Sequence, residues 1–414
     1  MSVFDIRNYP YDEQRNCLVI GGEAMVFHCH HYLNYLQRSI LDAEYIDSRP
    51  FIVGSAADAV FQQLSALCKD LSVDEAKQMA AEVYKTFGFG LIDLSAMTPE
   101  GGRFETYKSF YSKTWVMKFG ASAKPVDYFT AGYLAAAFAV IYNQPLTAVH
   151  SEQVTCMACG DAYNTHEVRW VKSGMGNFSV YPHKSPLKFN DSQKLPIGWK
   201  HEETVTRSFL GAHENMVGNE EGYIPAFGVY IARNLSDFIN RLQFEFVRAM
   251  KEVGGEYGEQ LASELLLEAG HACGFFTYGG VMTSQEWKTY VKPYLQTRED
   301  WIKGLASLIN TMGWGYHTVV EVSRERAVFR NYNDFEDLSY MRMYGLADKP
   351  VHWANSGGFT GLMQLIYNTE LVNGEVINTE EGFRHMRRSK AKYKTRMLKS
   401  IACGDDYLEA EISL

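Results

Sequence analysis

The sequence predicts an α+β protein made of two tandem homologous domains, each an antiparallel sheet with helices packed on it, which together form a pseudo-dimer. Three observations predict this class. Residues 86–146 match residues 311–371 at a constant offset of 225, aromatic segments with strand-like alternation recur in both stretches, and apolar helical segments flank them. An antiparallel sheet buries its apolar face when helices cover that face.

The repeat keeps its register over about 60 residues. The matching stretches are "TFGFG" (86–90) with "TMGWG" (311–315), "KPV" (124–126) with "KPV" (349–351), and "IYN" (141–143) with "IYN" (366–368). Near the start the offset is 200, because "GGEAMVF" (21–27) aligns with "EGYIPAF" (221–227). The second copy is therefore expected to contain about 25 extra residues, near residues 278–295.

The repeat also sets the domain boundaries. Residues 1–171 are predicted to form the first copy and residues 203–414 a second, degenerate copy. Between them, residues 172–202 are rich in Gly, Pro, Ser and Asn and have neither helical nor strand periodicity, which is typical of a connection.

Each copy has the same predicted order of elements. An apolar strand (17–27 in the first copy) leads to two helices, expected at 31–45 and 55–68 in the first copy and at 235–250 and 259–273 in the second. A third helix ends at the Gly-x-Gly, whose glycines suit a helix C-cap and a turn. The alternating aromatic segments 103–120 and 326–345 are predicted to be strands, and the helix 127–143 leads to a last strand pair.

Composition excludes several classes of partner. The net charge of −9 provides no positive field for phosphates, so neither nucleic acid nor a membrane surface is an expected partner. The polar N-terminus and the shortness of the most apolar stretch predict no leader and no membrane span. Seven thinly spread cysteines do not form a disulfide framework, which favours a reducing cytoplasm.

A run of histidines follows the first strand, in "VFHCHHYLNYLQR". If the strand continues, His28 and His30 share a face; if a helix begins at His28, His28 and His31 share one. Either geometry offers two imidazoles to a metal or to acid–base chemistry, so His28, His30 and His31 are the candidate catalytic residues. The alternative is a hydrogen-bonded structural histidine at a junction between a strand and a helix.

The stretch "KPVDYFTAGYLAAAFAVIYNQPLTAVHSEQVTCMACGDAYNTHEV" (124–168) resembles the closing half of the 4-vinyl reductase domain, which is also found in the effector-binding region of phenol- and xylene-responsive activators. The family pattern has a cysteine after Pro-Val and then Glu-x-x-Cys-x-x-x-Gly-Asp-x-x-Cys. The resemblance covers about residues 75–168 and is weaker in the second copy. It implies a compact α+β domain with an apolar pocket for a small hydrophobic or aromatic molecule and, in many members, a structural zinc ion.

The zinc ligands implied by the resemblance are only partly present. At the family's ligand positions this sequence has Asp127, Gln153, Cys156 and Asn164, with Glu152 one residue early. Because zinc accepts carboxylate oxygen as well as nitrogen and sulfur, a rearranged site is predicted from Asp127, Glu152, Cys156 and either Cys159 or His166. A metal-free fold with small buried cysteines is the main alternative, and a redox Cys-x-x-Cys pair is a lesser one.

The repeat suggests which copy carries the function. At an offset of 200 the residues opposite His28–His31 are Gly228, Val229, Tyr230 and Ile231, and at 225 Glu152 and Cys156 lie opposite Ile377 and Glu381. Both polar clusters are thus expected only in the first copy. This favours a functional site in the first copy and a structural or dimer-like role for the second.

Two functions are compatible with these features. The first is a binding or accessory protein of small-molecule metabolism, which holds a small hydrophobic or aromatic molecule in a pocket of the first domain lined by Phe104, Tyr107, Phe110, Trp115, Tyr128 and Phe129. The second is an enzyme dependent on zinc or iron that acts on such a molecule in the same pocket. No cofactor is expected for the binding protein, and the chain could act as a monomer or a homodimer.

Overall fold

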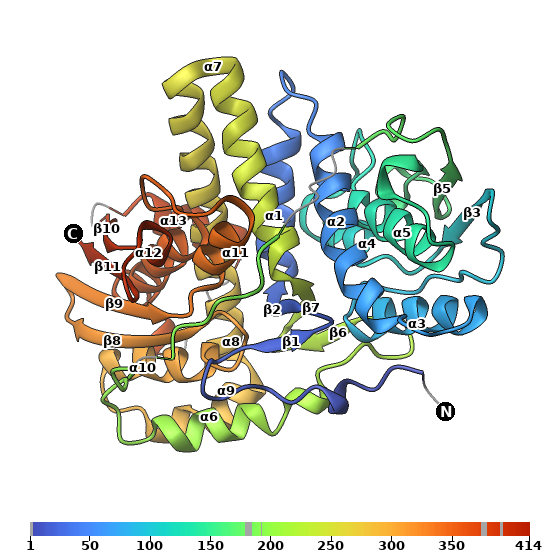
Figure 1. Cartoon of the computed structure of the whole chain (residues 1–414). Helices are drawn as coiled ribbons and strands as arrows, with labels where there is room; N and C mark the ends of the chain where they lie inside the picture. The colour runs from blue at the N-terminus through green and yellow to red at the C-terminus, as the bar shows by residue number, and fades with distance from the viewer. Residues whose placement is uncertain (1–2, 179–183, 192, 374–378, 390–391) are drawn as a thin grey trace.

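The computed structural model describes residues 3–178, 184–191, 193–373, 379–389 and 392–414 of the 414-residue chain (Figure 1). Its class is α+β, as predicted. Within these residues the strands form three antiparallel sheets, with strand orders β1-β2-β7-β6, β3-β5-β4 and β10-β11-β9-β8. Below, the N-terminal half means the described residues up to 171 and the C-terminal half those from 203 onward.

The central sheet contains strands from both halves. It consists of β1 (Leu18–Ile20), β2 (Glu23–Cys29), β6 (Ile224–Ala226) and β7 (Val229–Leu235). The apolar segment 17–27, predicted to be one strand, begins a hairpin instead, because Gly21 and Gly22 both adopt positive φ and make a two-residue turn. β2 pairs with β7, so backbone hydrogen bonds of this sheet join the two halves.

Each half also has a sheet of its own. The N-terminal sheet contains β3 (Gly101–Thr106), β4 (Val149–Thr155) and β5 (Asn164–Trp170). The C-terminal sheet contains β8 (Tyr316–Val322), β9 (Arg326–Tyr332), β10 (Lys394–Lys399) and β11 (Leu408–Ser413). Figure 1 shows these two sheets on opposite sides of the molecule, with the central sheet between them.

The helices follow the predicted order. The N-terminal half has α1 (His30–Leu41), α2 (Arg49–Leu67), α3 (Val73–Thr86), α4 (Phe110–Phe119) and α5 (Tyr128–Ile141). The C-terminal half has α6 (Glu202–Leu210), α7 (Ser236–Cys273), α8 (Gly279–Thr283), α9 (Gln285–Tyr290), α10 (Arg298–Ile309), α11 (Phe335–Tyr344), α12 (Ala354–Tyr367) and α13 (Glu380–Arg387). α7 consists of two limbs that reverse direction at Gly255, whose φ is 60° (Figure 1). It thus supplies both helices predicted there.

The prediction of strands throughout 103–120 and 326–345 is wrong in the second part of each segment. The strands end at Thr106 and Tyr332, and the helices α4 and α11 follow. Ser109 accepts a hydrogen bond from the Ser112 amide at the start of α4, and the equivalent cap of α11 is made by Asp334. Capping at one end and a positive-φ glycine at the other outweigh the aromatic alternation of these segments.

Corresponding elements of the halves begin at related positions. The two central hairpins and the helices after them are offset by 206, since β1, β2 and α1 begin at 18, 23 and 30 and β6, β7 and α7 at 224, 229 and 236. This offset exceeds by six residues the offset of 200 expected from the sequence. The short 3-10 helices Met157–Cys159 and Ile401–Cys403 are offset by 244, and each precedes the sequence Gly-Asp.

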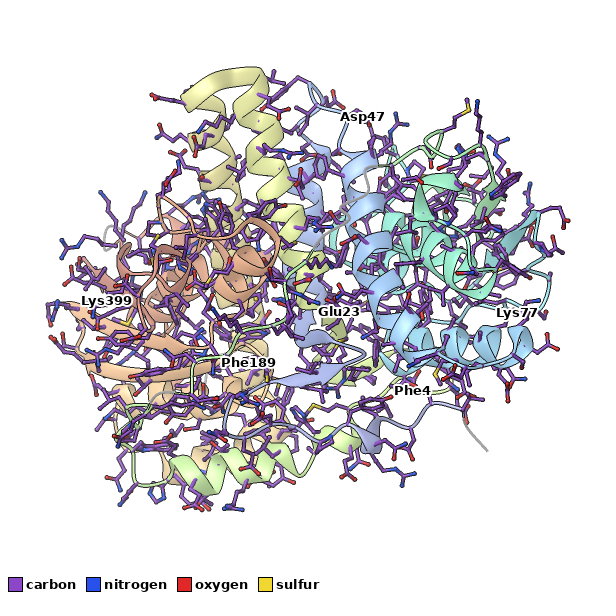
Figure 2. The ribbon with its side chains drawn as sticks, in the orientation of Figure 1. Phe4, Glu23, Asp47, Lys77, Phe189 and Lys399 are labelled. Atoms are coloured by element: carbon purple, nitrogen blue, oxygen red, sulfur yellow. The ribbon has the colours of Figure 1, made fainter. Side chains whose placement is uncertain are left out.

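A central ionic cluster lies where the halves meet. Its members are Glu23, Asp58, Lys184, Asp237, Arg241 and Arg342. Lys184, from the segment between the halves, lies 3.0 Å from both the Asp58 and Asp237 carboxylates. Arg342 lies 3.1 Å from Glu23, which Figure 2 shows near the middle of the molecule.

None of the helices in the described residues is both long enough and apolar enough to cross a membrane.

Candidate functional site

Asp127, a predicted metal ligand, is fully buried at the start of α5. One of its carboxylate oxygens accepts hydrogen bonds from the Thr130 hydroxyl (2.6 Å) and backbone amide. The other accepts from the Ser109 hydroxyl at 2.7 Å and from the Asn164 side-chain amide at 2.8 Å. Four donors therefore surround this carboxylate.

The other predicted metal ligands divide into two groups. Cys156 and His166 are buried near Asp127: the Cys156 sulfur lies 3.6 Å from the Ser112 hydroxyl, and the His166 Nε2 atom lies 3.2 Å from the Asp127 carbonyl oxygen. Glu152 and Cys159 are not part of this group. Glu152 faces solvent beside His150, and Cys159 is exposed.

This arrangement does not suit zinc as it stands. A tetrahedral zinc site needs free lone pairs on four converging ligands, whereas the oxygens of Asp127 are already hydrogen-bonded. Among the described residues, metal-ligand atoms of three side chains converge within 4.8 Å only at Asp334, Asp337 and His352. Binding of zinc or iron therefore stays an untested prediction from the sequence.

The His352 triad (Asp334, Asp337 and His352) is also well supplied with hydrogen bonds. Asp337 accepts from the Ser400 hydroxyl and from the backbone amides of Ile401 and Ala402. The His352 ring lies 3.1 Å from Asp337 and 3.5 Å from Asp334. Although burial opposes the charged imidazolium, these two carboxylates hold the pKa of His352 well above its usual value.

This triad is not among the site residues predicted from the sequence. At an offset of 225, Asp334, Asp337 and His352 correspond to Ser109, Ser112 and Asp127. The signal that could have revealed it is the second "ACGD" (402–405), which repeats 158–161 and places Ser400 opposite Cys156. The offset of 225 instead placed Ile377 and Glu381 opposite Glu152 and Cys156. Ile377 lies outside the described residues.

His28, by contrast, lies in an aromatic centre in which several polar atoms have no partner. Its ring is stacked on Tyr32 at 4.6 Å between centroids, and it lies 5.3 Å from Trp314 and 5.6 Å from Phe335. Neither nitrogen of His28, nor the hydroxyl of Tyr32, has a hydrogen-bond partner among the described residues. We call these four residues the His28 centre.

The chemistry of the His28 centre is that of a neutral imidazole in an apolar enclosure. His28 is 2% exposed and Tyr32 is 1% exposed. Burial lowers the pKa of His28 to about 3 and raises that of Tyr32. At neutral pH His28 therefore offers one N–H donor and one nitrogen acceptor, and Tyr32 offers a hydroxyl.

The neighbouring histidines belong to a different environment. His30 Nδ1 accepts a hydrogen bond from the Tyr230 amide at 3.2 Å, and His31 is stacked on Phe276. Burial lowers the pKa of His30 to about 4 and that of His31 to about 2. The rings of His30 and His31 lie 3.9 Å apart, whereas the ring contacts described for His28 are those of the His28 centre, so the run of histidines does not form a single group.

Most of the aromatic residues predicted to line the pocket are core residues. Phe104, Phe110, Trp115, Tyr128 and Phe129 are buried, whereas Tyr107 is 62% exposed. Phe129 is in contact with several other rings, including Phe89 at 4.3 Å and Phe238 at 4.9 Å. Tyr128 and Glu152 also line a surface pocket of about 320 Å³.

Comparisons with known proteins give weak structural similarity and no family assignment. No protein-family model and no curated protein matches this chain, so the resemblance to the 4-vinyl reductase family remains a prediction. Among solved structures, the chain has a weak similarity to the phenol-responsive sensory domain of the transcription activator PoxR with phenol. The sequences are 15% identical, the TM-score is 0.29, and the match covers 41% of this chain and 73% of that chain.

Proposed function

We propose that this protein binds a small aromatic molecule that carries a hydroxyl group, and that the His28 centre is its binding site. The observation that carries the proposal is the pair of unpartnered polar groups, His28 and Tyr32, enclosed by aromatic rings. Buried polar groups without partners are rare in folded proteins and mark sites filled by water, an ion or a ligand. Apolar surroundings with a few convergent polar groups are typical of small-molecule sites.

A hydroxyl matches the polar groups of this centre. A phenol-like hydroxyl can donate to the unprotonated nitrogen of His28 and accept from the Tyr32 hydroxyl at the same time. The indole of Trp314 is held in place by its own hydrogen bond to the Phe27 carbonyl at 2.8 Å, so it forms a fixed aromatic wall of this centre.

We further propose that the halves are copies of one ancestral domain. The offsets of 206, 225 and 244 for corresponding elements support this proposal. Under it, the residues opposite His28, Tyr32, Trp314 and Phe335 are Asn234, Phe238, Phe89 and Phe110. The centre formed by these four equivalent residues thus lacks the imidazole and the tyrosine hydroxyl that we propose bind the ligand.

Under this proposal the binding site differs from the one expected from the sequence. His28 and Tyr32 come from the N-terminal half, whereas Trp314 and Phe335 come from the C-terminal half. The second copy is then a contributor to the working site, and the pseudo-dimer is needed to complete it.

Calorimetric titration tests the proposal, with phenol and 2-naphthol as hydroxyl-bearing probes and benzene and naphthalene as matched probes without the hydroxyl. We expect saturable binding of at least one hydroxyl-bearing probe. His28→Phe keeps an aromatic ring and removes both nitrogens, so it should weaken that binding about tenfold, the worth of one to two hydrogen bonds. It should leave the hydrocarbon probes unaffected.

Tyr111→Phe is the matched control. Tyr111 also has a buried hydroxyl without a partner among the described residues, but it lies beside Phe129 in the N-terminal half. Removing that hydroxyl should not change binding if the His28 centre is the site. If Tyr111→Phe abolishes binding and His28→Phe does not, the ligand occupies the pocket predicted in the first domain and our assignment is wrong. Absence of binding by every probe also overturns it.

A further inference from the structure

Two buried cysteines from different halves face one another beside the His28 centre. The sulfur atoms of Cys29 and Cys273 are 4.0 Å apart, and the Thr277 hydroxyl lies between them, 2.5 Å from Cys29 and 3.4 Å from Cys273. The pair lies where the first residue of α1 follows β2 and where α7 ends. All the cysteines of the chain are free thiols in this structure.

We propose that Cys29 and Cys273 form a reversible disulfide, which makes this pair a redox-modification site that links the two halves. A disulfide requires sulfur atoms about 2.05 Å apart, so they must approach each other by roughly 2 Å. Cys29 is the last residue of β2 and Cys273 is the last residue of α7, so side-chain rotation with a small shift of the α7 end can supply this movement.

The surroundings of Cys29 favour its thiolate. Cys29 caps α1, and its sulfur accepts a hydrogen bond from the Tyr32 amide at 3.3 Å. Burial opposes ionisation of Cys29, but hydrogen bonds from Cys273, Thr277 and the first backbone amides of α1 outweigh burial and keep its pKa below the usual value. The same contact with Cys29, together with burial, raises the pKa of Cys273.

This asymmetry defines the chemistry of the pair. The Cys29 thiolate attacks a hydroperoxide, which breaks the O–O bond, releases an alcohol or water and leaves a sulfenic acid on Cys29. The Cys273 thiol then attacks that sulfur, and the sulfenic oxygen leaves as water. Two thiols and one hydroperoxide thus give one disulfide, one alcohol or water and one further water. A thiol reductant reverses the reaction by exchange.

The polypeptide around Cys273 is suited to a local adjustment. Residues Gly274–Tyr278 form a π-helical turn, a feature that occurs often at functional sites. Gly274 lies against α12, where a side chain would come within 2.8 Å of the Gly358 carbonyl oxygen. The end of α7 is therefore seated closely on α12 and can transmit a shift at Cys273 to that helix.

Peptide mapping of the full-length protein tests the proposal directly. The reduced protein is equilibrated with hydrogen peroxide, quenched, unfolded and alkylated, and then digested without reduction. We expect a cross-linked peptide pair containing Cys29 and Cys273, and two fewer alkylated thiols than the seven of the reduced chain. Dithiothreitol should restore all seven.

Four variants make the test specific. Cys29→Ser and Cys273→Ser should each prevent formation of the cross-linked peptide. Cys68→Ser, which removes another buried cysteine, should leave the cross-link intact. Thr277→Val removes the hydroxyl that contacts both sulfurs and should slow cross-linking by about 2- to 10-fold, the worth of one hydrogen bond. The proposal is wrong if Cys29 and Cys273 remain alkylatable after prolonged oxidation, or if either is found paired with a different cysteine.

A consequence for binding rests on the proposed function. In the disulfide, the Cys29 sulfur leaves its position under the Tyr32 amide, so the Tyr32 side chain is expected to shift in the His28 centre. The oxidised protein should then bind the phenol or naphthol probe more weakly than the reduced protein. The peptide map needs no ligand, so a disulfide without an effect on binding would refute only this consequence.

Discussion

The imidazole of His28 lies against the indole ring of Trp314, with 5.3 Å between the ring centroids. His28 is in a strand of the central sheet, and Trp314 is in the Gly-x-Gly loop of the C-terminal half. The same loop donates the Trp314 N–H to the Phe27 carbonyl, and its Met312 carbonyl accepts from the Phe27 amide. The contact therefore depends on the hydrogen bonds that hold this loop of the C-terminal half against β2 of the N-terminal half.

Removing the unpartnered polar groups should increase stability in the absence of ligand. Replacement of Tyr32 by Phe deletes a hydroxyl that is 1% exposed and has no partner among the described residues. A buried unsatisfied hydroxyl costs about 1–3 kcal/mol, so Tyr32→Phe should raise the free energy of unfolding by about 1 kcal/mol. Urea denaturation without ligand measures this change.

The control for Tyr32 is Tyr84, whose buried hydroxyl is hydrogen-bonded to Thr130 at 2.6 Å. Tyr84→Phe leaves the Thr130 hydroxyl with one partner fewer and should lower the free energy of unfolding by about 1 kcal/mol. If both variants are destabilised equally, the Tyr32 hydroxyl has a partner in solution, such as an ordered water, in the unliganded protein.

The sequence could predict each part of the His28 centre but not its assembly. The histidine run and the "TMGWG" loop are both visible, because residue type and the internal repeat reveal them. Which half each side chain faces depends on the pairing of β2 with β7, and long-range strand pairing is not encoded by local periodicity. The same limit applies to Asp337 and Ser400, which approach each other only because β10 and β11 extend the C-terminal sheet.

His352 should make stability fall at alkaline pH. Its pKa in the folded state is raised well above the usual value, so its contribution is complete below the unfolded pKa of about 6.5 and is lost as the pH rises through the folded pKa. In His352→Gln this contribution is absent, and the two aspartates lose a buried positive partner. We expect the variant to be about 3–5 kcal/mol less stable near pH 6.

Urea unfolding of the wild type and His352→Gln at pH values from 6 to 10 measures this difference. The gap should narrow as the pH rises, because the wild type loses its imidazolium. Both proteins carry Glu336→Gln in this comparison, because the pKa of Glu336 is raised to about 7 by burial and by Asp334 but is lowered by His352, so its titration would otherwise differ between them. A gap that stays constant over the whole range would show that His352 is uncharged in the fold.

Arg342 should be essential to the central ionic cluster. Its guanidinium is 3.1 Å from Glu23 and 3.0 Å from Asp237, and all three side chains are at most 3% exposed. Arg342→Met leaves buried carboxylates short of positive charge and should cost about 3–5 kcal/mol. Arg49→Met breaks an exposed pair with Asp47 and should change stability by less than about 1 kcal/mol. Comparable losses in both variants would contradict this assignment.

Glu23 should give the same cluster a dependence on pH. Burial, reinforced by Asp237, raises the pKa of Glu23 to about 8, so its stabilising contribution is complete below about pH 4 and is lost as the pH rises through 8. Glu23→Gln cannot ionise. The wild type should therefore lose stability relative to Glu23→Gln between pH 5 and pH 9, as measured by guanidinium denaturation. The reverse trend would mean that Arg342 and Lys184 keep Glu23 ionised.

Two glycines at equivalent positions of the repeat should be intolerant of alanine. A Cβ atom on Gly132 would lie 2.5 Å from the Val53 carbonyl oxygen in α2, and one on Gly357 would lie 2.2 Å from the Leu267 carbonyl oxygen in α7. Each glycine lets its helix, α5 or α12, lie directly on a neighbouring helix. Overpacking at such a contact costs about 1–3 kcal/mol.

Thermal unfolding of Gly132→Ala and Gly357→Ala measures this cost, with Gly211→Ala as the control because its added methyl group would have no neighbour closer than 3.5 Å. Both core variants should melt at lower temperature than Gly211→Ala. Since the glycines are related by the offset of 225, a similar loss at both sites would support the proposal that the two halves are copies of one domain with the same helix contact. Destabilisation at only one of them would mean that this contact is not shared by the two halves.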